Sequence, residues 1–105
     1  MSLDVLQKMP GKRFIITPGM IDLGDQQQSA NHDFGKYMKD RVDVVLLIGF
    51  IQSEDIRKGL TEVGFDMENV FTFQTVREAF NYIYQHASYE DTVLIENDLP
   101  DAFSR

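Results

Sequence analysis

The segment from Val42 to Ile48 is the feature that most limits what this chain can fold into. Its seven residues, VDVVLLI, form a nearly continuous run of branched apolar side chains interrupted by one acid. Such a run suits a strand that is buried on both faces, which is typical of a central strand in a parallel sheet. The sequence therefore predicts an α/β fold with helices on both faces of the sheet.

The rest of the chain alternates between strand patterns and helix patterns. Further strands are expected at Arg13–Thr17, Val70–Phe73 and Thr92–Ile95, and helices at about Gln26–Lys39, Ser53–Gly64 and Thr75–His86. The order β-α-β-α-β-α-β, with helical connections of ordinary length, favours right-handed crossovers between parallel strands. We therefore expect a three-layer domain with a mostly parallel sheet of at least four strands.

Local signals define where these helices begin and end. Asp25 and the hydroxyl of Ser53 are predicted to cap the first two helices. Thr75 and Glu78 have the spacing of a capping box at the start of the third. Gly64 is predicted to end the second helix, because glycine is the usual residue just beyond a helix C-terminus.

Length and composition favour one domain over a complete enzyme. The chain has 105 residues, of which 43% are hydrophobic, so residues 1–105 are expected to form a single domain that is small for a two-substrate enzyme. Residues 1–9 are expected to be a leader added in cloning or a segment that joins another domain. The chain has no cysteine, which excludes disulfides, thiol nucleophiles and cysteine-bound zinc, and a cytoplasmic location is expected.

The charge of the chain excludes some classes of partner. A net charge of −7 repels polyanions, so we expect no binding to nucleic acid or to anionic membranes. No apolar run approaches the roughly 20 residues that span a bilayer. A small phosphate ligand stays open, because backbone amides can bind one locally.

Three loops follow predicted strands and are the candidates for chemistry: residues 18–25, 49–53 and 96–101. Parallel strands would place all three at one edge of the sheet, where α/β proteins bind ligands. Gly19 indicates either a turn with positive φ or a close approach by a ligand, and the turn is favoured when this loop is considered alone. The acids and amide from Glu96 to Asp98 suit an ammonium group, a hydroxyl or magnesium, although a solvated turn before Pro100 is favoured on local grounds.

Other familiar sites are missing from the sequence. His32 and His86 have no serine or acid at a spacing that indicates a catalytic dyad or a metal pair, so no catalytic and no metal-binding residues are predicted. The chain contains neither a G-x-x-x-x-G-K-[ST] phosphate loop nor a G-x-G-x-x-G dinucleotide turn. It therefore lacks a self-sufficient nucleotide site.

Four motifs together resemble a known family over roughly residues 10–101. They are Thr17-Pro18-Gly19-Met20-Ile21-Asp22-Leu23-Gly24, Asn31-x-x-Phe34-Gly35, the segment from Val44 to Gly49, and the segment from Val93 to Asp101. The chain resembles the C-terminal domain of Mur ligases, and is similar to the UDP-N-acetylmuramoyl-tripeptide D-alanyl-D-alanine ligases among them. The resemblance implies a Rossmann-like domain of an ATP-dependent amide ligase that makes cell-wall peptidoglycan precursors in bacteria.

The resemblance also implies partners and cofactors. In such three-domain enzymes a substrate carboxylate becomes an acyl phosphate that an incoming amine attacks, and the central domain carries the phosphate loop. The C-terminal domain closes over ATP and Mg²⁺ and helps to bind the incoming amino acid or dipeptide, and alone it is expected to be inactive and to hold no cofactor tightly. By position, the ATP-side loop comprises Thr17, Pro18, Gly19, Met20 and Asn31, and the substrate-side loop comprises Glu96, Asn97 and Asp98.

The chain departs from the family pattern at three places. Pro18 replaces the aspartate of a Gly-Asp-Met turn, Asn31 stands where histidine is common, and Glu96-Asn97-Asp98 replaces Lys-Gly-Ser. The last change reverses the charge, so this loop should repel a substrate carboxylate and favour an amine or a hydroxyl. The incoming substrate is therefore left open. The alternative hypothesis is a free-standing flavodoxin-like or receiver-like binding or regulatory module.

Overall fold

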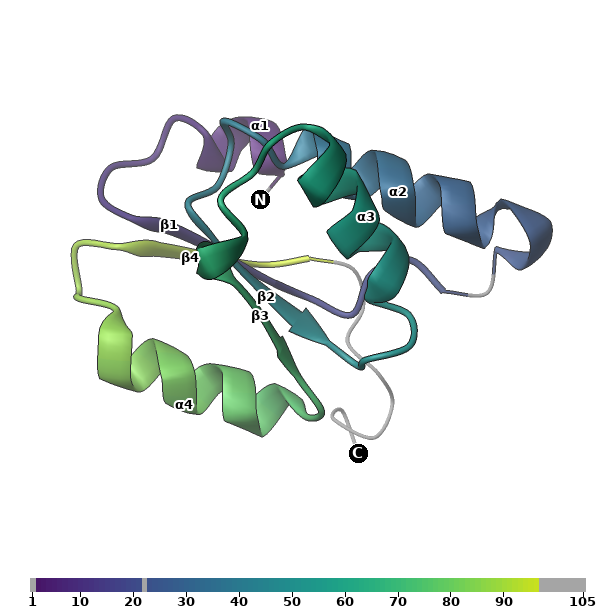
Figure 1. Ribbon diagram of the computed structural model, residues 1–105. Helices are drawn as coiled ribbons and strands as arrows, with labels where there is room; N and C mark the ends of the chain where they lie inside the picture. Colours follow the sequence, from purple (N-terminus) through teal and green to yellow (C-terminus); the bar gives the residue numbers. More distant parts are fainter. Residues whose placement is uncertain (1, 22, 97–105) are drawn as a thin grey trace.

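Four short apolar segments form one parallel sheet in the computed structural model, which describes residues 2–21 and 23–96 (Figure 1). The strands are β1 (Arg13–Thr17), β2 (Val44–Ile48), β3 (Val70–Phe73) and β4 (Thr92–Ile95), in the order β3-β2-β1-β4. Every residue of β2 is buried, as expected for a strand with neighbours on both sides and helices on both faces. The predicted sheet is confirmed, and the ends of three strands agree with the prediction.

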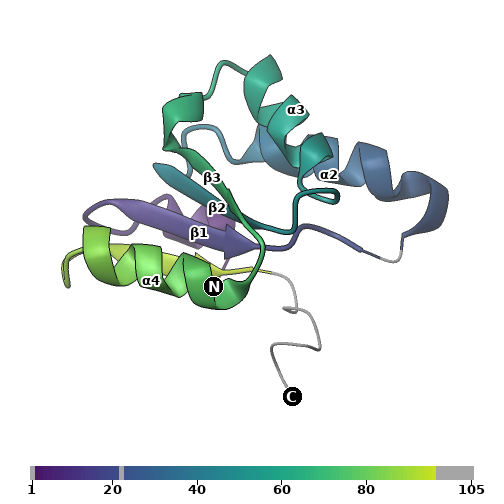
Figure 2. The ribbon, with the colours of Figure 1, turned by 60° about the horizontal axis from the view of Figure 1, so that its bottom comes forward.

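The sheet order explains how the helices divide between the two faces. The helices α2 (Gln27–Tyr37) and α3 (Glu54–Glu62) cover one face, and α4 (Val76–His86) covers the other (Figures 1 and 2). The chain moves outward from β1 to β2 to β3, and right-handed crossovers place both connecting helices on the same face. The return from β3 past β1 to β4 runs the other way, so its helix must lie on the opposite face.

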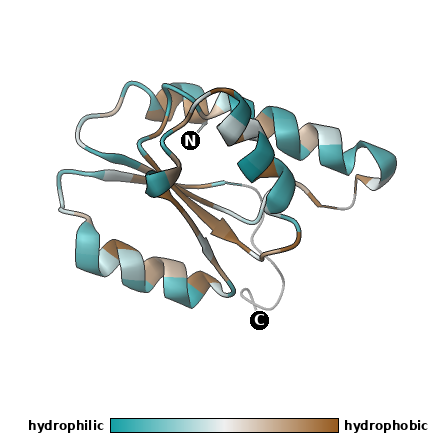
Figure 3. Cartoon of the chain, viewed as in Figure 1, coloured by the Kyte–Doolittle hydropathy of each residue, from teal (hydrophilic) through white to brown (hydrophobic). Residues whose placement is uncertain are grey.

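Alternate residues of the strands supply two separate cores. Ile15, Val45 and Leu47 face α2 and α3, while Phe14, Ile16 and Leu46 face α4. The central strands carry the longest hydrophobic stretch of the chain, and hydrophobic and hydrophilic residues alternate along the helices (Figure 3). Burial of this kind is worth about 25 cal/mol per Å² of apolar surface, so the two cores hold the layers together.

The helices α2 and α3 pack backbone to backbone at two glycines. A Cβ atom on Gly35 would lie 2.2 Å from the carbonyl oxygen of Ile56, and one on Gly59 would lie 2.0 Å from that of His32. Both distances are far below a van der Waals contact, so each helix needs a glycine where it meets the other. This close contact sets the position of the first turn of α3, which lies next to the carboxyl end of the sheet.

Two of the predicted helix caps are confirmed. Thr75 has an extended backbone and forms the full capping box with Glu78. Gly64 follows α3 with φ of 78°, and the amides of Gly64 and Phe65 donate to the carbonyls of Thr61 and Leu60. This is the hydrogen-bond pattern of a Schellman motif.

The other two predicted caps are wrong. Asp25 lies inside a short 3₁₀ turn, Gly24–Gln26, and α2 begins after Gln26 without a side-chain cap. Ser53 precedes α3 but has φ of −81° and ψ of −13°. A capping side chain requires an extended backbone, so the Ser53 hydroxyl cannot reach the free amides. Its Oγ is buried with no hydrogen-bond partner among the described residues.

The segment before β1 packs against the domain. A short helix, α1 (Leu3–Leu6), begins at Ser2, and its residues Leu3 and Leu6 are buried in the core that α2 and α3 cover. Residues 2–7 are therefore part of the fold, and their role as a joining segment stays a prediction. No helix within residues 2–21 and 23–96 has the length and apolar character needed to cross a bilayer.

Candidate functional site

The carboxyl ends of β1 and β4 lie side by side at the point where the strand order reverses. The connection after β1 leaves toward one face of the sheet, and β4 arrives from the helix on the other face. Open α/β sheets bind ligands in the crevice at such a switch point. The amide of Glu96 donates to the carbonyl of Ile16 over 3.0 Å, so the start of the predicted substrate-side loop lies beside the end of β1.

The turn after β1 is tight and internally satisfied. The hydroxyl of Thr17 accepts a hydrogen bond from the amide of Gly19 at 3.0 Å, and Gly19 has φ of 82°. A Cβ on Gly19 would lie 2.9 Å from Cδ1 of Ile56 and 3.0 Å from Oδ1 of Asn31. Both the positive φ and the crowding require glycine here, so the turn explains Gly19 without a ligand.

Asn31 holds this turn from α2. Its side chain is 1% exposed, its Oδ1 accepts from the amide of Met20 at 2.7 Å, and its Nδ2 donates to the carbonyl of Met20 at 3.0 Å. The two bonds use both the oxygen and the nitrogen of the side-chain amide, so Asn31 fixes the position of the loop relative to α2. The sequence did not predict this clamp, although an amide at an inward helix position was a signal for it.

The structure thus brings together the five residues predicted for the ATP-side loop: Thr17, Pro18, Gly19, Met20 and Asn31. All are buried except Met20, which is partly exposed. Any ligand at this edge would therefore contact Met20 and the residues after it, while the others fix the shape of the turn. Their proximity to ATP stays a prediction.

Met20 and Glu96 line one hollow of about 510 Å³, which joins the two predicted loops. Its other walls come from α1, α2 and the residues next to them: Ser2, Leu3, Asp4, Ala30, Asp33, Phe34 and Tyr37. The lining combines apolar side chains with three acids and contains no base. Asp33 was missed by the sequence analysis, although it adjoins the predicted inner face of the helix. Asn97 and Asp98 lie outside the described residues.

Asp4 is already engaged on one side of this hollow. The hydroxyl of Tyr37 donates to Oδ1 of Asp4 at 2.5 Å, and Nε of Arg41 lies 3.3 Å from the same oxygen. The hydrogen bonds from Tyr37 and Arg41 lower the pKa of Asp4, and the bond to Asp4 raises the pKa of Tyr37. Asp33 and Glu96 are the acids left to meet a cationic group.

The loop after β2 forms the neighbouring part of the same edge. Gly49 has φ of 90°, and its amide donates to the carbonyl of Phe73 at 2.7 Å, which fixes the start of the loop against β3. The next two side chains point outward, since Phe50 is 60% exposed and Ile51 is 88% exposed. This loop therefore presents two large apolar groups and no charge.

The segments that follow β1, β2 and β4 make their part of the carboxyl edge acidic. Residues 14–35 and 42–56 contain no lysine or arginine, whereas Asp25, Glu54, Asp55 and Glu96 follow the strands. A polyphosphate would be repelled here unless a cation or a basic surface came with it. Within residues 2–21 and 23–96 no three acidic or histidine side chains are grouped closely enough to hold a metal ion.

Both histidines lie away from the crevice. Nε2 of His32 contacts Oε2 of Glu62 at 2.7 Å across the outer side of α2 and α3. Nδ1 of His86 lies 3.0 Å from the carbonyl oxygen of Tyr82, and the two rings stack with centroids 4.1 Å apart. His32 thus contacts the neighbouring helix and His86 contacts its own helix, and neither faces the predicted site.

Parallel strands in the order β3-β2-β1-β4, with helices on both faces and a crevice at the switch point, define a Rossmann-like α/β domain. Flavodoxin-like and receiver-like sheets have the order 2-1-3-4-5, with β1 beside β3. Here β1 pairs with β2 and β4, so the alternative flavodoxin-like or receiver-like build is wrong.

Residues 1–96 match the family model described as Mur ligase, glutamate ligase domain, and the chain belongs to this family. A comparison with curated protein sequences gave no match. Among solved structures, the chain is similar to a crystal structure of MurF from Acinetobacter baumannii, with a TM-score of 0.66 and 18% identity over 89% of this chain. At that identity the likeness shows the fold. The chain spans 20% of the length of that protein.

Proposed function

We propose that this chain is the C-terminal domain of an ATP-dependent Mur ligase-like amide ligase that acts in bacterial peptidoglycan precursor synthesis. The match of residues 1–96 to the Mur ligase family carries the proposal. The position of the Thr17–Met20 turn at the switch point supports it, since this is where such a fold meets a ligand. The absence of cysteine fits action in the cytoplasm.

The chain's own residues define what this domain would contribute. It has no phosphate loop, and residues 14–35 and 42–56, around the ends of β1 and β2, contain no lysine or arginine, so a central domain would hold ATP and Mg²⁺. In the reaction, a substrate carboxylate takes the terminal phosphoryl group of ATP, and an amine then displaces phosphate to form the amide. The Thr17–Met20 turn would cover the ATP side of this reaction, and closure would exclude water that could hydrolyse the acyl phosphate.

The hollow beside Glu96 is the candidate place for the incoming amine. Its free acids, Asp33 and Glu96, attract an ammonium group, and Met20 and Phe34 provide apolar surface for the body of the molecule. A free carboxylate at the same position would be repelled. The proposed incoming substrate is thus an amino acid or dipeptide whose amine faces Glu96.

The test uses the natural full-length protein and follows ADP release that depends on an added amine. Glu96→Gln should raise the KM for the amine about tenfold, which corresponds to the loss of one hydrogen bond to a charged group, and should leave the KM for ATP nearly unchanged. Glu68→Gln, at an exposed position of the turn before β3, is the matched control and should change neither value. ADP release without amine dependence, or an equal effect of both variants, would contradict the proposal.

A further inference from the structure

We propose that two copies of this chain associate through β3, with the two β3 strands paired antiparallel across a two-fold axis at Thr72. β3 is the last strand on one side of the sheet, so one of its long sides has no neighbouring strand among the described residues (Figure 1). We call this side, together with the part of α3 that flanks it, the β3 border. The inference concerns self-association and does not depend on the proposed function.

The main chain of Thr72 points away from the sheet. The carbonyl of Phe73 accepts a hydrogen bond from the amide of Gly49 at 2.7 Å, so Phe73 directs its main-chain groups toward β2. Successive residues of a strand direct these groups to opposite sides, so the amide and carbonyl of Thr72 point away from β2. Neither group has a partner within residues 2–21 and 23–96. The β3 border therefore presents one free donor and one free acceptor on the same residue.

Antiparallel pairing satisfies both of these groups. With the two-fold axis at Thr72, the amide of each copy donates to the carbonyl of the other, and the two residues form a hydrogen-bonded pair. On either side of Thr72, the amides of Val70 and Gln74 are already used by contacts within the chain. Thr72 therefore sets the register. A symmetric pair of this kind closes with two copies and leaves no open strand for a third.

The side chains of β3 suit this pairing. The strand has the sequence VFTF, with β-branched and aromatic residues and with none of the charges or prolines that commonly protect an exposed strand. In the proposed register Phe71 of each copy lies opposite Phe73 of the other, on the face that α4 covers. Both rings already pack against Tyr82, with ring centroids 4.7 and 6.0 Å from its centroid. Cross-strand aromatic pairs stabilise antiparallel strands, and these rings are held in place before association.

The part of α3 in the β3 border is balanced in charge, whereas the chain as a whole carries −7. Two hollows of about 550 and 640 Å³ lie along this helix, and their lining includes two acids and two bases: Glu54, Arg57, Lys58 and Glu62. Nη1 of Arg57 donates to Oγ1 of Thr72 at 3.0 Å, which places this side of α3 next to the proposed axis. Two copies therefore meet here with less repulsion than at an acidic surface.

The two-fold axis also brings opposite charges together. α3 runs from the carboxyl edge of the sheet to the amino edge, opposite to β3, and the axis reverses its direction in the second copy. Glu54 of one copy thus lies toward the half of the other α3 that carries Lys58. Glu62, in the same half, is already engaged with His32 at 2.7 Å. The β3 border therefore supplies both members of the ion pair, which favours a second copy over a foreign partner.

The test is analytical ultracentrifugation of the natural full-length protein over about a hundredfold range of concentration. One short strand makes a small interface, so the wild type should form a weak dimer whose fraction rises with concentration. Thr72→Pro removes the outward amide but no bond to β2, and proline is tolerated at such positions of border strands. Its dimer dissociation constant should be at least about tenfold higher than that of the wild type. A wild type that stays monomeric would overturn the proposal.

Thr72→Val is the matched control for the proline variant. It also loses the hydroxyl that Arg57 contacts but keeps the amide, so its dissociation constant should stay within about twofold of the wild-type value. Circular dichroism of both variants verifies that the domain is folded. Equal dissociation constants for the two variants would assign self-association to another surface and overturn the proposal.

A charge exchange tests the same axis without changing the strand, and it decides the matter if the proline variant does not fold. Lys58→Glu should raise the dissociation constant about fivefold, because it replaces an attraction by a repulsion at two symmetry-related places. Adding Glu54→Lys should restore the wild-type value. Lys8→Glu, at an exposed position after α1, makes the same change in net charge and should have little effect. If both lysine variants weaken the dimer equally, or if the second exchange restores nothing, the β3 border is not the interface.

Discussion

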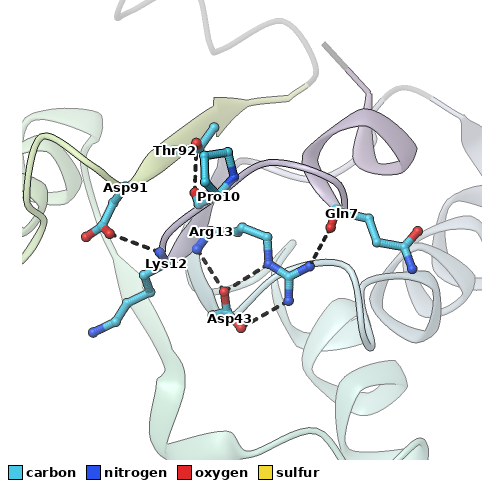
Figure 4. A network of polar contacts seen from close by, with 7 residues as sticks. All are labelled: Gln7, Pro10, Lys12, Arg13, Asp43, Asp91 and Thr92. Atoms are coloured by element: carbon cyan, nitrogen blue, oxygen red, sulfur yellow. Dashed lines mark hydrogen bonds and ion pairs between the residues drawn. The ribbon is translucent and has the colours of Figure 1, made fainter.

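The two edges of the sheet are built in contrasting ways. At the amino edge, Asp43 accepts from Nε and Nη2 of Arg13 at 2.9 and 3.1 Å and from the Arg13 backbone amide at 2.8 Å. Nearby, Oδ1 of Asp91 accepts from the amide of Lys12 at 2.9 Å (Figure 4). The carboxyl edge has acids and exposed apolar side chains after β1, β2 and β4. One edge is therefore held by hydrogen bonds to its carboxylates, and the other leaves acids and apolar side chains exposed.

The contacts at the amino edge lower the pKa values of two carboxyl groups. The hydrogen bond from Arg13 lowers the pKa of Asp43, and the backbone amides of Ser88 and Lys12 lower the pKa of Asp91. Both carboxylates thus stabilise the folded state through contacts that fix the starts of strands.

The largest effect is expected from a change that moves α3 away from the carboxyl edge. Gly59→Ala would place a methyl group 2.0 Å from the carbonyl oxygen of His32 and force α2 and α3 apart. We expect a loss of about 3 kcal/mol in the free energy of unfolding, the upper part of the range for overpacking, despite the gain of up to about 1 kcal/mol in helix propensity. Urea unfolding of the variant and the wild-type protein measures this loss.

Lys58→Ala, on the exposed side of the same helix, is the control and should be nearly neutral. The NMR amide shifts of Gly19 and Met20 should change more in Gly59→Ala than those of Lys12 and Asp43. A variant as stable as the wild-type domain would show that the helices separate easily and that the carboxyl edge does not depend on their contact.

A smaller effect is expected from removing the clamp on the turn. Asn31→Ala leaves the amide and carbonyl of Met20 without their partners, and we expect a loss of about 2 kcal/mol for these two bonds in a largely buried site. Asn81→Ala, on the exposed face of α4, should change stability little. If thermal unfolding places both variants at the same stability, water replaces the clamp and the turn is not held by α2.

The smallest effect is expected at the amino edge and depends on pH. Asp43→Asn weakens the contact with Arg13, and since Asp43 is partly exposed we expect a loss of about 1 kcal/mol at pH 7. The folded-state pKa of Asp43 lies below the unfolded value of about 3.9, so its contribution is present above that value and is lost as the pH falls through the folded-state pKa.

The difference in the free energy of unfolding between Asp43→Asn and the wild type should therefore become smaller below about pH 4, as measured by urea titration. Glu90→Gln, an exposed acid near the same edge, is the control and should show no such convergence. If this difference in the free energy of unfolding stays the same at low pH, the charge of Asp43 does not stabilise the fold.

The strands were predictable because their apolar runs leave few alternatives. The run around β2 required burial on both faces, and the capping box at Thr75 was complete in the local sequence. The caps at Asp25 and Ser53 failed because residue type alone does not set the backbone angles before a helix. The order of the strands in the sheet was not predictable. It depends on how the right-handed crossovers are arranged in space, and the sequence of a single segment does not determine that arrangement.

The candidate site was predictable only in part, for the same reason. The turn after β1 and the start of the loop after β4 were identified from their motifs, and the fold brings them to the switch point. The clamp of Asn31 on Met20 and the hollow that joins Met20 to Glu96 arise from tertiary packing. Local sequence patterns contain no information about such contacts between distant segments.

The pairing of β1 with β4 also has a consequence for how the domain forms. Lys12 and Asp91, at the start of this pair, are 79 positions apart, whereas β1 and β2 are separated by one helix. Contacts over long sequence separations close late in folding, and a growing chain emerges from the ribosome with its N-terminus first. The crevice between β1 and β4 should thus be the last part of this sheet to be assembled during synthesis, after β1, β2 and β3 have paired.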